Sequence, residues 1–144
     1  MKKLLLFGFF LTSCMLGAVP APDGWTTDIG EARSRAQKEN RPVLVLFSGT
    51  DWCPPCKELR KNLLDTRDFR KLLDEKAVAL YVHVPRRADD GFRKTMADFS
   101  FVRLQSVPTI LVTDPGITRV LQTVEVRSLQ GFSRALDAAA KKLP

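Results

Sequence analysis

The feature that most limits how this chain can fold is an unbroken apolar run, 43–47, followed closely by two cysteines spaced Cys-x-x-Cys. The run contains β-branched residues and no alternating polar positions, which predicts a strand covered on both faces at the centre of a sheet. Residues 48–52 predict the turn out of that strand. A helix with an apolar leucine face is predicted to begin at Cys53. Cys53 and Cys56 are therefore expected in the first turn of a helix that follows a central strand.

The rest of the chain is predicted to complete one α/β domain over 28–144, because 144 residues suit a single core. Residues 77–84 predict a second covered strand. A helix between it and the first strand makes a βαβ unit, so the two strands should be parallel. The other predicted elements are a helix over 29–39 capped by Asp28, a helical turn starting at Asp68, a weak helix over 91–99, strands over 110–113 and 119–126 that form a hairpin, and a helix over 128–143.

The first 27 residues are predicted to lie outside this domain. Lys2 and Lys3 precede a short apolar run, 4–11, and small residues follow, which is typical of a secretory signal peptide over 1–18. The run is far shorter than the ~20 apolar residues that a membrane-spanning helix needs. Residues 19–27 contain prolines and a glycine and are interpreted as a linker. The protein is therefore predicted to be exported.

Two hypotheses for cleavage of that signal stay open. Residues 11–14, Leu-Thr-Ser-Cys, resemble the lipobox of bacterial lipoproteins, in which Cys14 becomes a lipidated amino terminus that tethers the domain to a membrane. Residues 16–18 and 19–21 instead resemble sites for ordinary signal peptidase, which would remove Cys14. Both hypotheses place the mature protein outside the cytoplasm, in the periplasm or anchored to a membrane and facing the periplasm.

Charge and cysteine content limit the classes of partner and cofactor. The formal net charge is +7, but basic residues alternate with acidic ones along the predicted helices, so no nucleic-acid partner is predicted. Outside the signal, Cys53 and Cys56 form the internal pair. A zinc site is disfavoured because tetrahedral zinc needs four ligands, and the chain adds one histidine, His83, on a predicted buried strand. No metal or other cofactor is predicted, since the thiol pair itself carries electrons.

The Cys-x-x-Cys pair predicts thiol-disulfide chemistry. Two thiols at this spacing can form a disulfide, and a helix N-terminus stabilises a thiolate on the first of them. Cys53 is the predicted attacking thiol, at the exposed end of the helix, and forms a mixed disulfide with the substrate. Cys56 lies one turn further in, is expected to be more shielded, and resolves that intermediate. The alternative, a chance pair with no redox role, is disfavoured by the βαβ setting and the exported location.

Two blocks resemble the thioredoxin superfamily: 52–57, Trp-Cys-Pro-Pro-Cys-Lys, after an apolar strand, and 107–109, Val-Pro-Thr, before another. The resemblance covers about residues 25–143. It implies a thioredoxin-like fold with a central mixed β-sheet flanked by helices, a cis peptide before Pro108, and contact between that loop and the cysteine pair. The substrate-binding surface is assigned to Trp52, Pro54, Val107, Pro108 and Thr109.

Two of these assignments keep an alternative. A cis bond before Pro108 lets a backbone edge face an extended substrate strand, which favours a role in binding. The alternative is a proline that only begins a strand. Trp52 is interpreted as an apolar contact surface beside the thiols, and the alternative is a core aromatic.

The chain departs from thioredoxins proper in two places. Its strand before the motif lacks their buried aspartate, so another group or water must take the proton from Cys56. Glu58 is the nearest acid, and some exported thioredoxin-like domains also carry one there; the alternative is a solvated helix glutamate. Pro54 stands where thioredoxin has glycine, and with Pro55 it removes two N–H donors from the first helical turn. The Cys53 thiolate is then less stabilised, which predicts a comparatively reducing pair.

These expectations combine into one functional hypothesis. The chain is an extracytoplasmic thiol-disulfide oxidoreductase that exchanges disulfides with protein substrates, as a reductase or an isomerase, and takes electrons from a membrane donor protein. The alternative is a redox-inactive peptide-binding module that uses the surface of Trp52 and Pro108. A peroxidase of the peroxiredoxin type is disfavoured, because no proline lies four residues before Thr50.

Overall fold

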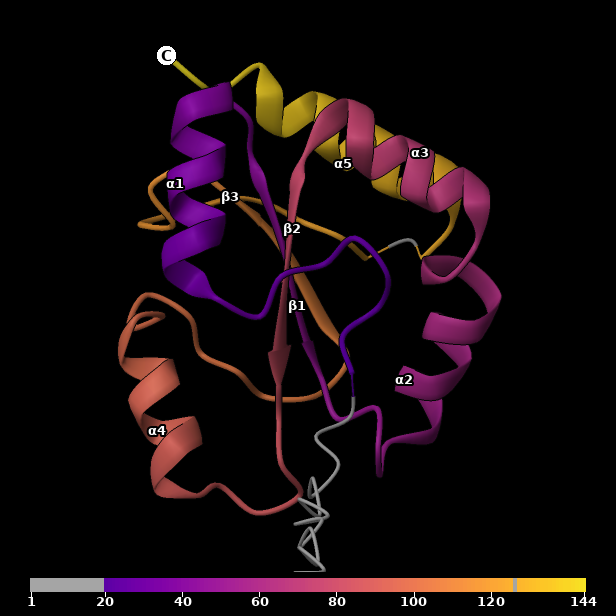
Figure 1. Ribbon diagram of the computed structural model, residues 1–144, viewed down its shortest axis with the longest axis vertical. Helices are drawn as coiled ribbons and strands as arrows, with labels where there is room; N and C mark the ends of the chain where they lie inside the picture. Colours follow the sequence, from indigo (N-terminus) through magenta and orange to yellow (C-terminus); the bar gives the residue numbers. More distant parts are fainter. Residues whose placement is uncertain (1–19, 126) are drawn as a thin grey trace, which may run out of the picture.

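In the computed structural model, which describes residues 20–125 and 127–144, helices cover both faces of a four-stranded sheet (Figure 1). The signal peptide predicted over 1–18 and the lipidation candidate Cys14 lie outside the described residues. Within the described ranges, no helix has the length and apolar character needed to cross a membrane.

The sheet has the strand order β2-β1-β3-β4. Its strands are β1 (Val43–Ser48), β2 (Val78–His83), β3 (Thr109–Thr113) and β4 (Val120–Thr123). β1 and β2 are parallel, β3 is antiparallel to β1, and β4 is antiparallel to β3. The central position of β1, the parallel pair and the C-terminal hairpin are therefore confirmed.

Helices cover the two faces in separate groups (Figure 1). Their bounds are α1 Ile29–Glu39, α2 Pro54–Leu59, the π-helical turn η1 Arg60–Leu64, α3 Arg67–Lys76, α4 Asp90–Ala97 and α5 Leu129–Ala140. α1 and α4 lie on one face, and α2, α3 and α5 lie on the other. The helix predicted from Cys53 is thus α2 continued by η1.

Each face has its own apolar core, because side chains of β1 alternate between the two faces. Leu46 joins the core under α3 and α5, where Phe132 packs edge to face on Phe69 with ring centroids 4.9 Å apart. Phe47 joins the core on the side of α1 and α4 and meets Phe99 with centroids 5.1 Å apart. The end of β1 is therefore held from both sides, which fixes the start of the turn that carries the cysteines.

Helix ends follow local capping. As predicted, α1 begins after Asp28, whose carboxylate accepts a first-turn N–H at 2.9 Å, and it ends at Asn40, a residue with a left-handed φ of 48°. The start predicted for α3 at Asp68 was wrong, because the hydroxyl of Thr66 is the cap and accepts a backbone N–H at 3.3 Å. Asp68 lies inside the first turn, where its negative charge interacts favourably with the positive end of the helix dipole.

The turn between β3 and β4 is closed by Asp114. Its carboxylate accepts the N–H groups of Thr118 and Arg119, each at 2.8 Å, and the hydroxyl of Thr118 at 2.9 Å. Burial is the largest effect and raises the pKa of Asp114, but hydrogen bonds from Thr118, Arg119 and Gly116 together outweigh it and lower the pKa. The ionised carboxylate therefore stabilises this turn.

Residues 20–27, the described part of the segment 19–27 that was predicted to be a linker, pack onto the domain. Trp25 is buried and stacks over a phenylalanine of α3. The N–H of Thr26 donates to the Ala79 carbonyl at 3.0 Å, and its carbonyl accepts the N–H of Tyr81 at 2.8 Å. The linker prediction was wrong because a segment without periodic apolar positions can still dock through one tryptophan and the open edge of β2.

Candidate active site

The turn after β1 brings both cysteines to the start of α2. The Gly49 carbonyl accepts backbone N–H groups from Trp52 at 3.0 Å and from Cys53 at 2.7 Å. A Cβ at Gly49 would collide with the indole of Trp52, so this turn requires glycine. Cys53 caps α2, and Pro54 occupies the first turn, where a missing N–H leaves no helical bond unmade.

Cys53 and Cys56 are joined by a disulfide, with Cα atoms 5.3 Å apart. The Cys56 N–H donates toward Cys53 Sγ over 3.3 Å. Cys53 is 4 % exposed and Cys56 is 1 % exposed. The expectation of an exposed Cys53 was therefore wrong, although Cys56 is the more shielded of the two.

The loop before β3 contacts Cys53. The Val107–Pro108 peptide bond is cis, and the Val107 carbonyl oxygen lies 3.8 Å from Cys53 Sγ. Pro108 is buried, whereas Val107 and Thr109 are half-buried. The Thr109 hydroxyl donates to the carbonyl of Ser106 at 2.6 Å, which tightens the loop. The cis bond and the contact between loop and cysteine pair are confirmed.

Trp52 forms one wall of a groove beside the disulfide. Its indole N–H donates to the Val84 carbonyl at 2.8 Å, which fixes the ring against the segment after β2. The groove has a volume of about 280 Å³, and Trp52, Phe92, Leu104 and Val107 contribute to its lining. The ring of Trp52 is half-buried at the edge of this groove, so the core alternative does not hold.

A hydroxyl network under the turn was missed at the sequence level. We define it as Ser48, Thr50 and Tyr81. The Thr50 hydroxyl lies 3.0 Å from the Ser48 hydroxyl and 3.1 Å from the Tyr81 hydroxyl, and Tyr81 also reaches the Ser48 carbonyl at 3.4 Å. The available signal was the chain's single tyrosine inside an apolar strand. The network ties β2 to the turn that delivers Cys53.

His83 does not lie in the buried part of β2 as predicted. It is the exposed last residue of the strand, and its Nε2 lies 3.8 Å from the carboxylate of Asp51. Strand ends turn toward solvent where the sheet stops, so the buried pattern of β2 breaks at this position. Within the described part of the chain, no three His, Cys, Asp or Glu side chains come together as a set of metal ligands.

Glu58 lies on the exposed side of α2. It follows Cys56 by two residues, and helical positions two apart do not face each other. Cys56 is buried on the opposite side of the helix. A direct proton transfer from Cys56 to Glu58 therefore has no geometric support.

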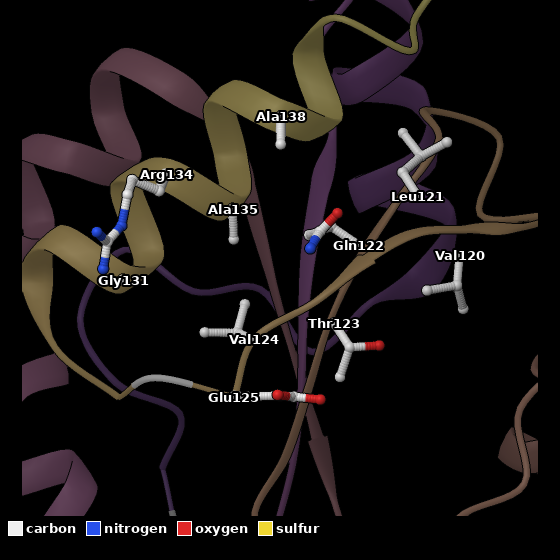
Figure 2. Close-up of a pocket in the computed structure, with 10 residues that line it drawn as sticks. All are labelled: Val120, Leu121, Gln122, Thr123, Val124, Glu125, Gly131, Arg134, Ala135 and Ala138. Atoms are coloured by element: carbon white, nitrogen blue, oxygen red, sulfur yellow. The ribbon is translucent and has the colours of Figure 1, made fainter.

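A second groove lies between β4 and α5 (Figure 2). Its volume is about 640 Å³, and Glu125 and Arg134 are the ionisable residues of its lining. It shares no lining residue with the groove beside Trp52 and contains neither cysteine. The thiol chemistry therefore belongs to the smaller groove.

Residues 24–115 match a protein family described as thioredoxin-like. The matched range covers more than half of the chain and includes both cysteines and Pro108. The chain belongs to the thioredoxin-like family. The α/β fold that the two sequence blocks implied is thereby confirmed, and it agrees with the mixed sheet and its flanking helices.

Individual relatives agree with this membership. The thioredoxin-related protein DsbJ of Chlamydia pneumoniae is 32% identical over 89 residues, which cover 57% of this chain and 26% of DsbJ. The matched region thus spans about a quarter of that relative. A solved structure titled DsbH Oxidoreductase has a TM-score of 0.65 at 16% identity and covers 83% of this chain and 85% of its own. A disulphide isomerase from Xylella fastidiosa Temecula1 has a TM-score of 0.54 at 18% identity, and the match covers 87% of this chain and 95% of the isomerase chain. These two likenesses concern the fold.

Proposed function

We propose that this thioredoxin-like protein is an extracytoplasmic thiol-disulfide oxidoreductase acting on protein substrates. The observation that carries the proposal is the Cys53–Cys56 disulfide at the start of α2, against the carbonyl of Val107. The two cysteines lie three positions apart, and their Cα atoms are 5.3 Å apart, within the range that a disulfide spans.

The exchange uses the two cysteines alone. In the dithiol form, the Cys53 thiolate attacks one sulfur of a substrate disulfide, a bond forms between those sulfurs, and the other substrate sulfur leaves as a thiolate. Cys56 then loses its proton and attacks Cys53 Sγ, and the mixed disulfide breaks to release the second substrate thiolate. With two protons the substrate becomes a dithiol, and the protein is left as the disulfide.

The different surroundings of the two cysteines support their roles. Cys53 lies at the helix N-terminus, where the Cys56 N–H, 3.3 Å from Cys53 Sγ, and the helix dipole favour a thiolate. Cys56 lies one turn inside and is the more buried, so it reacts after the mixed disulfide has formed. Glu58 is proposed to accept the proton of Cys56 through intervening water. Water is needed because Glu58 lies on the solvent side of α2.

The substrate is proposed to bind as an extended segment beside the cis bond. Val107 offers a backbone edge next to Cys53 Sγ, and an extended chain can pair with such an edge. Trp52 lines the groove, and Pro54, exposed next to Cys53, is proposed to contact the same segment. The buried Pro108 and the bond from the Thr109 hydroxyl to Ser106 hold the loop in place.

The protein is proposed to act as a reductase or isomerase after export. The charged start and short apolar run of residues 1–18 support export, and Cys14 is the proposed tether if that signal is a lipoprotein signal. A reductase ends each cycle as the disulfide, so a dithiol partner must reduce it again. In an oxidising compartment that partner is proposed to be a membrane electron-donor protein.

The reduction potential tests the direction of exchange. The purified protein is equilibrated in defined thiol buffers, and the fraction of Cys53–Cys56 disulfide is measured. A potential near that of thioredoxin, about −270 mV, is expected for a reductase. A potential near that of strong periplasmic oxidants, about −120 mV, would instead make the protein a disulfide donor.

Trapping tests whether the cysteines act on proteins. Cys56→Ser should accumulate mixed disulfides through Cys53, visible as slower bands that disappear with reductant on denaturing gels. Cys53→Ser is the matched control and should give none, because the attacking thiol is absent. If neither variant traps a protein while both retain the same binding partners, the chain is a peptide-binding module.

A further inference from the structure

The groove beside the disulfide has a mostly apolar lining, with Gln105 and Ser106 as neutral polar residues and a single charged residue. Phe92, Leu104 and Val107 contribute apolar side chains, and Arg86 is the one ionisable residue of the described lining. Arg86 is exposed, and within the described chain no carboxylate lies within 4.0 Å of its guanidinium. This differs from Arg60 in η1, which contacts Asp65 at 3.2 Å.

Neighbouring basic side chains strengthen the positive field at this rim. Arg87 and Arg103 are exposed beside the lining segments and likewise have no carboxylate partner among the described residues. Each of them is next in sequence to a lining residue. Three arginines without an ion-pair partner among the described residues therefore lie in or next to the segments that line the groove.

The nearby carboxylates are already engaged. Asp89 caps α4 by accepting the N–H of Phe92 at 2.7 Å, and Asp90 contacts Arg93 at 2.5 Å. Asp51 faces His83 at 3.8 Å. None of these three carboxylates lies within 4.0 Å of the Arg86 guanidinium, so among the residues that the structure describes Arg86 has no ion-pair partner.

We propose that this groove selects substrate segments with an apolar residue next to the reactive cysteine and a carboxylate further along, which pairs with Arg86. This specificity rests on the proposed oxidoreductase function, because the cysteine of the bound segment must reach Cys53. The apolar side chain fills the groove between Trp52 and Phe92. Guanidinium and carboxylate pair through two parallel hydrogen bonds, which suits Arg86 to an Asp or Glu of the substrate.

Three peptides test the proposal with the purified full-length protein in its reduced form. Each has the sequence X-Val-Cys-Val-X, with the cysteine as a mixed disulfide with a chromogenic aromatic thiol, and X is Glu, Gln or Lys. The second-order rate constant for release of the chromophore is measured at low salt. We expect the Glu peptide to react about two- to fivefold faster than the Gln peptide, as for a solvent-accessible ion pair. The preference should shrink in 0.5 M salt.

Reversing the charge of Arg86 tests whether this residue is the source of the preference among the peptides. Arg86→Glu should invert the preference, so that the Lys peptide becomes the fastest of the three. Arg119→Glu is the matched control, because Arg119 is exposed and lies in the β3–β4 turn, at the opposite end of β3 from Thr109. It should leave the wild-type preference unchanged.

The outcomes separate this inference from the proposed function. Equal rates for all three peptides with the wild-type protein would overturn the charge selection and leave the oxidoreductase function standing. Equal loss of preference in both Arg variants would overturn the assignment to Arg86, because the net charge of the whole protein would then be responsible. No reaction with any peptide, in a sample shown to contain free thiols, would overturn both proposals.

Discussion

The hydroxyl network under the active-site turn predicts an unequal cost for two conservative substitutions. Thr50 lies at its centre, because the Thr50 hydroxyl contacts the hydroxyls of both Ser48, at 3.0 Å, and Tyr81, at 3.1 Å. Tyr81 lies at one end and also reaches the Ser48 carbonyl at 3.4 Å. Thr50→Val and Tyr81→Phe each remove one hydroxyl and keep nearly the same shape.

The expected free energies of unfolding follow from which partners remain. Tyr81→Phe removes one good hydrogen bond and one long one, and Thr50 keeps Ser48 as a partner, so the loss is about 1 kcal/mol. Thr50→Val removes both bonds of the central hydroxyl and leaves the side chain of Ser48, 2 % exposed, without its partner. That loss is about 2–3 kcal/mol, because an unpaired buried hydroxyl adds its desolvation cost.

Urea denaturation of the oxidised protein measures both losses. A thermal melt is a second measurement, in which a loss of about 1 kcal/mol should lower the midpoint temperature by roughly 4 °C for a domain of this size. The double variant should lose less free energy of unfolding than the sum of the losses of the two single variants, because each single substitution removes the same Thr50–Tyr81 hydrogen bond. Thr27→Val is the control: Thr27 is exposed, and its variant should stay within about 0.5 kcal/mol of the wild type.

Two results would refute this reasoning. One is a Tyr81→Phe loss equal to or larger than that of Thr50→Val, since Thr50 would then not be the central hydroxyl. The other is strict additivity in the double variant, which would mean that the two hydroxyls do not share a bond.

Two further predictions concern stability. Asp114→Asn should lower the free energy of unfolding by about 1 kcal/mol at pH 7, because charge-assisted bonds become neutral ones. The lowered pKa of Asp114 means that this stabilisation is present above its unfolded pKa, about 3.9, and is lost as pH falls through the folded pKa. Urea titrations should therefore converge for wild type and variant at low pH, and a constant gap would contradict the assignment. Phe132→Ala should cost about 3–5 kcal/mol, since Phe132 is 0 % exposed. Phe101→Ala, at a residue that is 36 % exposed, should cost under about 1 kcal/mol by the same urea assay, and similar losses for both would argue against the core under α5.

Local sequence patterns were sufficient where one segment carries all the information. The bounds of α1 follow from Asp28 at its start and Asn40 at its end, and both residues act within one turn of themselves. The apolar run of β1 predicts a central strand, because a strand covered on both faces does not alternate between apolar and polar residues. The disulfide of Cys53 and Cys56 needs only their spacing at a helix start.

Local patterns failed where a residue's surroundings come from elsewhere in the chain. Residues 20–27 have the composition of a linker, yet Trp25 docks on α3 and Thr26 pairs with β2. Cys53 was expected to be exposed, yet it is buried, and the Val107 loop, 54 positions away, contacts it. His83 was expected to be buried, but the last residue of β2 extends past the core.

The sequence alone determined the order of elements, the covered central strand, the redox pair and, through two short blocks, the family. These depend on backbone preferences and spacings within a few residues, which the chain carries locally. Only the tertiary structure decided the hydroxyl network of Ser48, Thr50 and Tyr81, the groove between Trp52 and Val107, and the position of Arg86 in the lining of that groove. The physical reason is that these features join segments whose relative register and orientation are set by the packing of both cores at once.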